Sequence, residues 1–313
     1  MVNIDESNLD GLKPFTKYPQ GSLIVLDYDG SNSVFVPDPS KAIWYPGLKD
    51  RVEKLDEIGY IITMSSGRGL DDIQSKTNIP EIRNYAGSHG GQVLVNGELR
   101  DYMPKEKQDK LRYVYNYILR KLKERGLPCF IDIEDDKPGS MILHWRKYCE
   151  DAKMTGQKLS KFEKDLFDRY INPVCDEYNH QNPDMRIKVD DHGMTAEFSP
   201  EIARNKGDAL IDFVFPFVDG KPDLTSPMYK NILIMGDSGT DENMMRKADE
   251  LSNSHGLYIV SVTVQQQSTP EWMMEREYPH IVLGYNPESD PDMKLGGVLF
   301  VKRVYEVLLN SPD

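Results

Sequence analysis

Two aspartates at the end of an apolar run are the residues of this sequence best suited to chemistry. In the segment LIVLDYDGSNS, residues 23–33, four apolar residues lead directly into Asp27 and Asp29, which a single residue separates. Residues 23–26 are typical of a buried strand, and Gly30 with the small polar residues after it is typical of a turn. The pattern therefore predicts two carboxylates at the carboxyl end of a buried strand.

A second acidic turn, GDSGTDENMM, follows another predicted buried strand at residues 232–235. Because ligands bind at the carboxyl ends of strands in open α/β sheets, Asp237 can meet Asp27 and Asp29 in one crevice. Clustered carboxylates raise one another's pKa unless a cation is present, and Mg²⁺ prefers such oxygen ligands. We therefore predict a Mg²⁺ site, although the Asp27–Asp29 turn taken alone is equally compatible with a solvated loop.

The polar turn SSGRG follows a third predicted strand, at residues 60–64. Its position at the end of a strand could bring Ser66 to the same edge of the sheet. Ser66 is equally compatible with a helix N-cap, and Arg68 with a surface charge.

The order of predicted elements indicates an inserted domain. Strand and helix patterns alternate in the first hundred residues and again after residue 198, as in a parallel α/β sheet. Between them, two long amphipathic helices and four short strands predict a small α+β domain. Strands are predicted at 130–136, 141–146, 186–189 and 194–198. The predicted fold is therefore an α/β core formed by residues 1–103 and 198–313, with an inserted domain at residues 104–197.

Composition narrows the classes of function. The 313-residue chain has a formal net charge of −13 and 39% hydrophobic residues, so it lacks the basic balance of a nucleic-acid-binding protein. A metal ion and a few lysines can still make one cleft attractive to a phosphorylated ligand. No apolar run reaches the ~20 residues of a membrane span. Scattered cysteines and the lack of a signal-peptide pattern predict a cytoplasmic protein.

Four short segments resemble, in order, the motifs of the haloacid-dehalogenase (HAD) phosphohydrolases. They are LDYDGS, the serine in SSGRG, the lysine in NKGDAL (Lys206) and GDSGTDE. The resemblance implies a Rossmann-like parallel-sheet core with an inserted cap that determines substrate specificity. It makes Asp27 the nucleophile that forms an aspartyl-phosphate, and Asp29 the general acid and base.

The same resemblance assigns the remaining core residues. The Asp27 carboxylate, the Asp29 backbone carbonyl and Asp237 would hold Mg²⁺. Asp241 would fix a metal-bound water or the position of Lys206. Ser66 and Lys206 would hold the phosphoryl oxygens.

The predicted inserted domain resembles one family within this superfamily, the trehalose-6-phosphate phosphatases. The similar segments are EDDKPGSMILHWR, AGSHGG and DDHGMTAEFSP, together with the form SGR of the second motif. The sequence departs from the family at Ser31-Asn32-Ser33 and at Ser238. The resemblance places seven residues near the substrate: Arg68, His89, Glu134, Lys137, His144, Arg146 and Glu197.

Several of these residues have an ordinary structural alternative. His144 could be a half-buried strand residue, Glu134 part of a solvated acidic loop and His89 a loop histidine. Trp145 is expected to face the core.

The expected function is Mg²⁺-dependent hydrolysis of trehalose 6-phosphate. The alternatives are a phosphatase of the sucrose-phosphate or mannosyl-3-phosphoglycerate type, or a catalytically silent subunit that binds a sugar phosphate. A trehalose-phosphate synthase is a possible partner.

Overall fold

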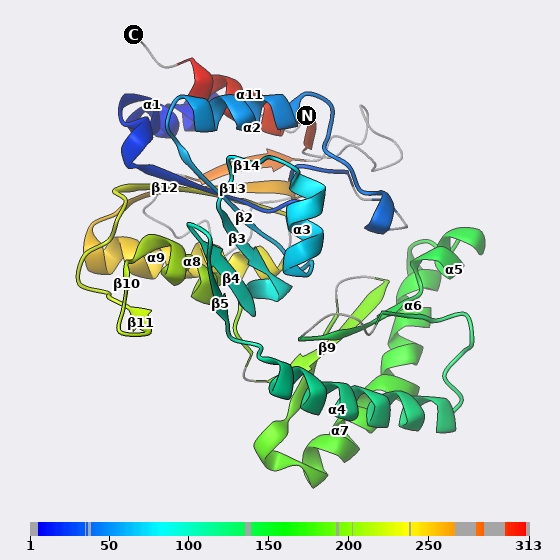
Figure 1. Ribbon diagram of the computed structural model, residues 1–313. Helices are drawn as coiled ribbons and strands as arrows, with labels where there is room; N and C mark the ends of the chain where they lie inside the picture. Colours follow the sequence, from blue (N-terminus) through cyan, green and yellow to red (C-terminus); the bar gives the residue numbers. More distant parts are fainter. Residues whose placement is uncertain are drawn as a thin grey trace. The chain divides into compact units, whose positions relative to one another are not determined.

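The chain forms two compact units. Unit 1 comprises Met1–Tyr102 and Arg204–Asp313, and unit 2 comprises Met103–Ala203 (Figure 1). Unit 2 begins one residue before the predicted insertion, 104–197, and ends six residues after it. The computed structural model describes residues 6–34, 36, 39–134, 139–191, 194–201, 203–237, 239–266, 280–284 and 298–310.

An eight-stranded sheet forms the centre of unit 1, in the order β14-β13-β12-β1-β2-β3-β4-β5. The strands from β14 to β3 are parallel, which confirms the predicted α/β class with a mainly parallel sheet. The antiparallel edge formed by β4 and β5 was not predicted. The strands are β1 (Ser22–Leu26), β2 (Ile61–Ser65), β3 (Asn84–Gly87), β4 (Gln92–Val95), β5 (Glu98–Asp101), β12 (Asn231–Gly236), β13 (Tyr258–Gln266) and β14 (His280–Gly284).

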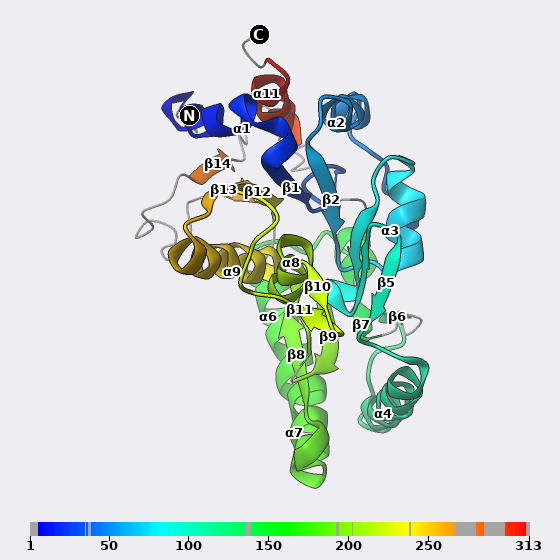
Figure 2. The ribbon, with the colours of Figure 1, turned by 60° about the vertical axis from the view of Figure 1, so that its left-hand side comes forward.

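Helices cover both faces of this sheet, because alternate residues of each strand point to opposite sides. Ile24 and Leu26 of β1 pack with α1, α2, α3 and α11, whereas Leu23 and Val25 pack with α8 and α9 (Figure 2). The helices are α1 (Lys13–Lys17), α2 (Leu48–Glu57), α3 (Leu70–Thr77), α8 (Lys206–Val214), α9 (Gly239–His255) and α11 (Val298–Leu309). Shorter elements of the unit are η1 (Glu6–Leu12), η2 (Pro19–Gly21), η3 (Pro39–Lys41), η4 (Ser88–Gly90), β10 (Phe217–Val218) and β11 (Lys221–Pro222).

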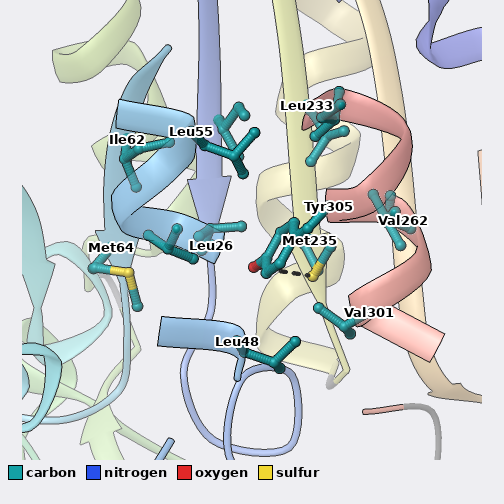
Figure 3. Close-up of a cluster of buried hydrophobic side chains, with 14 of the residues drawn as sticks. Leu26, Leu48, Leu55, Ile62, Met64, Leu233, Met235, Val262, Val301 and Tyr305 are labelled. Atoms are coloured by element: carbon teal, nitrogen blue, oxygen red, sulfur yellow. Dashed lines mark hydrogen bonds between the residues drawn. The ribbon is translucent and has the colours of Figure 1, made fainter. Parts of the chain in front are cut away.

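The apolar cluster beneath α2 and α11 fixes the end of β1. Leu26 and Met235 of the adjacent strands point into this cluster, and Tyr305 from α11 lies between them (Figure 3). All three side chains are fully buried. The strand end that carries Asp27 is therefore attached to a close-packed interior, which resists small displacements.

Unit 2 has its own core, formed by a four-stranded antiparallel sheet in the order β6-β7-β9-β8 and by helices packed against one face. The predicted α+β pattern is present here, and Trp145 is buried in this core as expected. Its elements are α4 (Lys105–Glu124), β6 (Asp132–Glu134), β7 (Met141–His144), α5 (Arg146–Asp151), α6 (Gln157–Leu166), η5 (Phe167–Ile171), α7 (Asn172–Gln181), η6 (Pro183–Met185), β8 (Ile187–Asp191) and β9 (Thr195–Pro200).

Two predicted elements differ from the structure. The strand predicted at 141–146 ends at His144, and Arg146 is the first residue of α5. The strand predicted at 194–198 continues to Pro200 as β9. None of the described helices combines the length and the apolar character needed to cross a membrane.

Candidate active site

A buried lysine joins two of the predicted acidic residues. Lys206 Nζ donates hydrogen bonds to Asp27 Oδ1 at 2.7 Å and to Asp241 Oδ1 at 2.5 Å. Each of the three residues is at most 4% exposed. The structure thus brings together side chains that are up to 214 residues apart in the sequence (241 − 27). Their hydrogen bonds are charge-assisted and shielded from water, which makes the arrangement rigid.

The end of β1 and the turn after it hold Asp27 in place. The Asp27 amide donates to the Met235 carbonyl of β12 at 3.0 Å, so the parallel ladder extends one residue beyond β1. Asn32 Nδ2 donates to the Asp27 carbonyl at 2.6 Å, and the Tyr305 hydroxyl donates to Asn32 Oδ1 at 2.6 Å. Asn32, which departs from the family pattern, thus connects this turn to α11.

The N-terminus of α8 positions Lys206. Asn205 is the N-cap, and its side chain accepts from the amides of Gly207 and Asp208 while Asp208 accepts from the Asn205 amide. This capping box satisfies backbone donors that a helix start otherwise leaves unpaired. A Cβ on Gly207 would lie 2.6 Å from the Asn243 carbonyl oxygen, so glycine permits the close approach of α9.

The second acidic turn requires glycine at the end of β12. A Cβ on Gly236 would lie 2.3 Å from Asp241 Cγ, inside any permitted contact. The Asp237 amide donates to Asp241 Oδ2 at 3.2 Å. Carboxylate oxygens of Asp27, Asp237 and Asp241 all lie within 4.8 Å of one another. Ser238, between these acids, lies outside the described residues.

The charges in this cluster do not balance. Three carboxylates face one ammonium group, a sum of −2 when all are ionised. Burial raises the pKa of Asp27 to about 7, Lys206 opposes this, and the charges of Asp241 and Asp29 add to it. Burial and the charges of Asp27 and Asp241 also raise the pKa of Asp237. Carboxylate oxygens of this number and charge fit a divalent cation such as Mg²⁺.

Lys206 remains charged in this environment. Burial alone would lower its pKa, but the carboxylates of Asp241 and Asp27 outweigh burial and raise it. Both Asp241 oxygens accept hydrogen bonds, from Lys206 and from the Asp237 amide. This supports the predicted role of Asp241 in fixing Lys206.

Asp29 is held by the predicted substrate ligand Arg68. Arg68 Nε and Nη2 donate to the two Asp29 carboxylate oxygens, each at 2.7 Å, and Nη1 donates to Asp72 Oδ2 at 2.7 Å. The arginine side chain is 9% exposed and that of Asp29 is 32% exposed. Burial would lower the pKa of Arg68, but Asp29 and Asp72 raise it. In this structure the guanidinium therefore binds the predicted acid–base residue.

Asp72 was not predicted as a site residue. It lies four residues after Arg68, in the first turn of α3. The four-residue spacing, at which side chains pair on a helix, was the available sequence signal, although Arg68 itself precedes the N-cap Gly69 and lies outside α3. Asn32 had no comparable signal, because its partners come from Asp27 and from the distant Tyr305.

Ser66 and His89 lie together in the turns that follow β2 and β3. Ser66 is 1% exposed, its amide donates to the Ala86 carbonyl at 2.9 Å, and its hydroxyl accepts from the Arg68 amide at 3.2 Å. The His89 amide donates to the Ser66 carbonyl at 3.1 Å. A Cβ on Gly67 would lie 2.6 Å from the His89 ring, so the glycine leaves space for this imidazole.

Three of the residues predicted near the sugar lie on neighbouring strands of the sheet of unit 2, at positions that share one face. Glu134 is paired with Ile142, which is paired with Glu197, and His144 is paired with Thr195. Their neighbours Leu143, Ala196 and Phe198 face the core, so His144 and Glu197 belong to the opposite face. The Glu134 side chain and the whole of Lys137 lie outside the described residues.

Arg146 belongs to a different element from this face. It begins α5 after Trp145, because the chain leaves the strand after His144. The interpretation of Arg146 as the end of a cap strand was therefore wrong.

Comparison with known proteins supports the resemblance found in the sequence. No family model matches the chain. A probable trehalose-phosphate phosphatase 3 of Oryza sativa subsp. japonica is 24% identical over 254 residues, covering 77% of this chain and 62% of that protein. Trehalose 6-phosphate phosphatase RA3 of Zea mays is 24% identical over 265 residues, covering 81% and 67%. The chain thus spans about three fifths of the length of the first of these relatives.

Solved structures share the fold over nearly the whole chain. The C-terminal domain of C. albicans trehalose-6-phosphate phosphatase gives a TM-score of 0.65 at 18% identity, with 98% of both chains covered. Aspergillus fumigatus trehalose-6-phosphate phosphatase gives 0.57 at 18% identity, covering 97% and 98%. The C-terminal domain of a Candida albicans trehalose synthase regulatory protein gives 0.59 at 13% identity with the same coverage. The chain therefore shares the fold of these structures.

Proposed function

We propose that this chain hydrolyses a sugar phosphate monoester, with trehalose 6-phosphate as its substrate. The observation that carries the proposal is the buried arrangement in which Lys206 joins Asp27 and Asp241 beside Asp237. A protein that only bound sugar phosphate would need hydrogen-bond donors for the phosphate. It would not need a carboxylate that can attack phosphorus. The names of the curated relatives supply the choice of trehalose 6-phosphate.

Asp27 is the proposed nucleophile. A bond forms between its carboxylate oxygen and phosphorus while the bond from phosphorus to the sugar oxygen breaks. Lys206 is already within hydrogen-bonding distance of Asp27, so its charge can offset the charge that develops on the phosphoryl oxygens. Ser66 supplies a second polar group at the same edge of the sheet.

Asp29 is the proposed general acid and base. It gives a proton to the leaving sugar oxygen, and it then takes a proton from the water that attacks the aspartyl-phosphate and restores Asp27. Both Asp29 oxygens accept from Arg68 in this structure. Each of these oxygens has a second lone pair, so Asp29 can exchange a proton with the substrate while it accepts from Arg68.

The donor set fits Mg²⁺. Asp27 and Asp237 would hold the ion with their carboxylates and Asp29 with its backbone carbonyl, and Asp241 would orient the site through Lys206. When bound, Mg²⁺ supplies positive charge next to the phosphoryl oxygens. It also offsets the repulsion that raises the pKa of Asp27 and Asp237.

His144 and Glu197 on the sheet of unit 2 are the proposed sugar contacts, together with Glu134 and Lys137. A hydroxyl-rich ligand needs polar partners in fixed positions. His144 and Glu197 provide them from the neighbouring strands β7 and β9. Association with a trehalose-phosphate synthase and a cytoplasmic location stay predictions.

Phosphate release from trehalose 6-phosphate tests the proposal. Sucrose 6-phosphate, mannosyl-3-phosphoglycerate and glucose 6-phosphate serve as competing substrates, each measured with Mg²⁺ and with EDTA. Preference for trehalose 6-phosphate that EDTA abolishes is the expected result.

The other outcomes separate the parts of the proposal. Preference for another substrate would retain the role of Asp27 and reject the sugar assignment. Tight binding without release from any substrate would favour the silent, sugar-phosphate-binding alternative.

A further inference from the structure

A second ionic cluster, formed around a buried carboxylate, lies in unit 1 at the two points where the chain crosses to unit 2. This crossing cluster consists of Arg100, Tyr102, Arg204 and Asp212. Asp212, on α8, is fully buried, and both of its carboxylate oxygens accept hydrogen bonds. Arg204 Nη2 donates to Oδ2 at 2.5 Å and the Tyr102 hydroxyl donates to Oδ1 at 2.9 Å. Arg100 Nη1 donates to the Asp212 backbone carbonyl at 3.0 Å.

The cluster joins the two crossings to each other. Tyr102 is the last residue of unit 1 before unit 2, and Arg204 is the first residue after it. The Arg204 guanidinium lies 3.5 Å from the centroid of the Tyr102 ring. The Tyr102 amide donates to the Gly91 carbonyl at 3.0 Å, and Arg204 Nε donates to the Gly90 carbonyl at 3.1 Å. Both crossings are therefore fixed to each other and to the same turn.

The same residues lie next to the lysine of the active site. Arg204 immediately precedes the N-cap Asn205, and Lys206 is the first residue of α8. Gly90 has φ +94°, and a Cβ there would lie 2.6 Å from the Asn205 carbonyl oxygen, so the two backbones are in close contact. A displacement of Arg204 would consequently shift Lys206 relative to Asp27.

On this geometry, and resting on the proposed function, we propose that the crossing cluster positions Lys206 by fixing both chain crossings to unit 1. Any movement of unit 2 during turnover acts on the chain at residues 103 and 203. The cluster restricts bending to residues beyond it, so that Lys206 keeps its hydrogen bonds to Asp27 and Asp241. Arg204 and Asp212 act through Lys206, without contacting the substrate.

Substitutions at Arg204 test this role. Variants Arg204→Gln, Arg204→Lys and Tyr102→Phe are assayed with Mg²⁺ on trehalose 6-phosphate and on p-nitrophenyl phosphate, which has no sugar. We expect Arg204→Gln to lower kcat on the order of 10- to 100-fold on both substrates, because small displacements of a catalytic group have effects of this size. KM should stay within about threefold, since sugar contacts are unchanged.

The other two variants should cause smaller losses of kcat than Arg204→Gln, and a control variant tests the loss of an arginine elsewhere. Arg204→Lys should recover part of kcat because it retains a cation, and Tyr102→Phe should cause the smallest loss. The matched control is Arg186→Gln, which removes an arginine that is paired with Glu201 at 2.9 Å on the surface of unit 2. It should leave both kinetic constants unchanged.

Amide hydrogen exchange supplies a readout that does not depend on activity. Arg204→Gln should raise exchange rates at residues 205–214 by about tenfold or more relative to the wild type, if the start of α8 is released. If Arg204→Gln does not fold, Tyr102→Phe carries both measurements.

Three results would overturn the inference. A folded Arg204→Gln protein with normal kcat and only a lower Tm would make the cluster purely stabilising. Loss of activity on trehalose 6-phosphate alone would assign the effect to sugar recognition, and unchanged exchange would refute the anchoring. A wild-type protein without phosphatase activity would instead defeat the proposed function, while the exchange measurement would still decide whether the crossings are anchored.

Discussion

Unit 1 contains two ionic clusters around buried carboxylates, and their net charges are of opposite sign. Around Lys206, three carboxylates face one cation, a sum of −2, whereas in the crossing cluster one carboxylate, Asp212, faces two arginines, a sum of +1. Burial raises the pKa of both Asp27 and Asp212. The neighbouring residues act differently. Nearby acids raise the pKa of Asp27 further, whereas Arg204, Tyr102 and Arg100 lower the pKa of Asp212.

This difference separates a site for chemistry from a structural anchor. A buried charge is tolerated when its partners compensate it, as Arg204, Tyr102 and Arg100 do for Asp212. Around Lys206 three carboxylates share one ammonium group, and the divalent cation that we propose would offset the excess of negative charge. Uncompensated burial of acids is typical of functional sites, which trade stability for reactivity.

The largest expected effect is on turnover. Asp27→Asn removes the nucleophilic oxygen but keeps an acceptor for Lys206, so turnover of trehalose 6-phosphate should fall about 10⁴-fold or more while binding persists. Steady-state kinetics and calorimetric binding with Mg²⁺ measure the two. Normal turnover in this variant would exclude the aspartyl-phosphate mechanism.

The next effect concerns stability of the compensated cluster. Asp212→Ala leaves Arg204 and Arg100 without their buried partner, so the free energy of unfolding should fall by about 3–5 kcal/mol. Urea unfolding measures the change. The control is Asp223→Ala, which removes a half-buried carboxylate that accepts from the neighbouring Thr225. Equal losses in the two variants would contradict the distinction between the clusters.

The active-site cluster should respond in the opposite direction. In EDTA near pH 8, Asp27→Asn removes a carboxylate whose charge is disfavoured by burial, so the variant should be about 1–2 kcal/mol more stable than the wild type. The comparison is made by urea unfolding in the same buffer. A less stable variant would show that Asp27 is already compensated without a metal.

The pH dependence of stability follows from the same residue. Folding raises the pKa of Asp27 from 3.8 to about 7, so between these values the folded state holds a proton that the unfolded state has lost. This contribution is fully present below about pH 4 and is lost as the pH rises through about 7, with a slope of at most ~1.4 kcal/mol per pH unit. Unfolding in EDTA from pH 5 to 8 measures the slope, which Asp27→Asn should reduce and Mg²⁺ should reverse.

The smallest expected effect is in unit 2. His144→Ala should raise KM for trehalose 6-phosphate about threefold to tenfold and leave p-nitrophenyl phosphate hydrolysis unchanged, because one neutral hydrogen bond is worth about 1 kcal/mol. His180→Ala, in the last turn of α7, is the control. Equal losses on both substrates would reject a sugar contact.

The active-site elements of unit 1 were predictable because their signals are local. An apolar run ending in Asp27 or Asp237 predicts a buried strand and an acidic turn, and strands β1 and β12 occur at those places. The prediction that both acidic turns meet at one edge used the rule that ligands bind at the carboxyl ends of parallel strands, and the structure pairs β1 with β12 in parallel. Strands β4 and β5 were missed because four-residue strands with little apolar alternation have a weak pattern.

The contacts of individual side chains were decided by the tertiary structure. The sequence identified Arg68 as a site residue, but its partners Asp29 and Asp72 depend on how two turns meet. Arg146 is in a helix because the chain leaves the sheet after His144, which a strand pattern does not reveal. The crossing cluster combines residues from β5, both crossings and α8, so no local sequence pattern predicts it.

The sequence by itself determined that two buried strands end in acidic turns, that a domain is inserted between them, and which residue types are available for phosphate chemistry. These depend on periodicity and turn residues, which act over a few positions. Only the tertiary structure decided that Lys206 bonds to both Asp27 and Asp241, and that Asp212 holds the two crossings together. The physical reason is that a buried charge is stabilised only by specific partners at hydrogen-bonding distance, and folding alone brings those partners together.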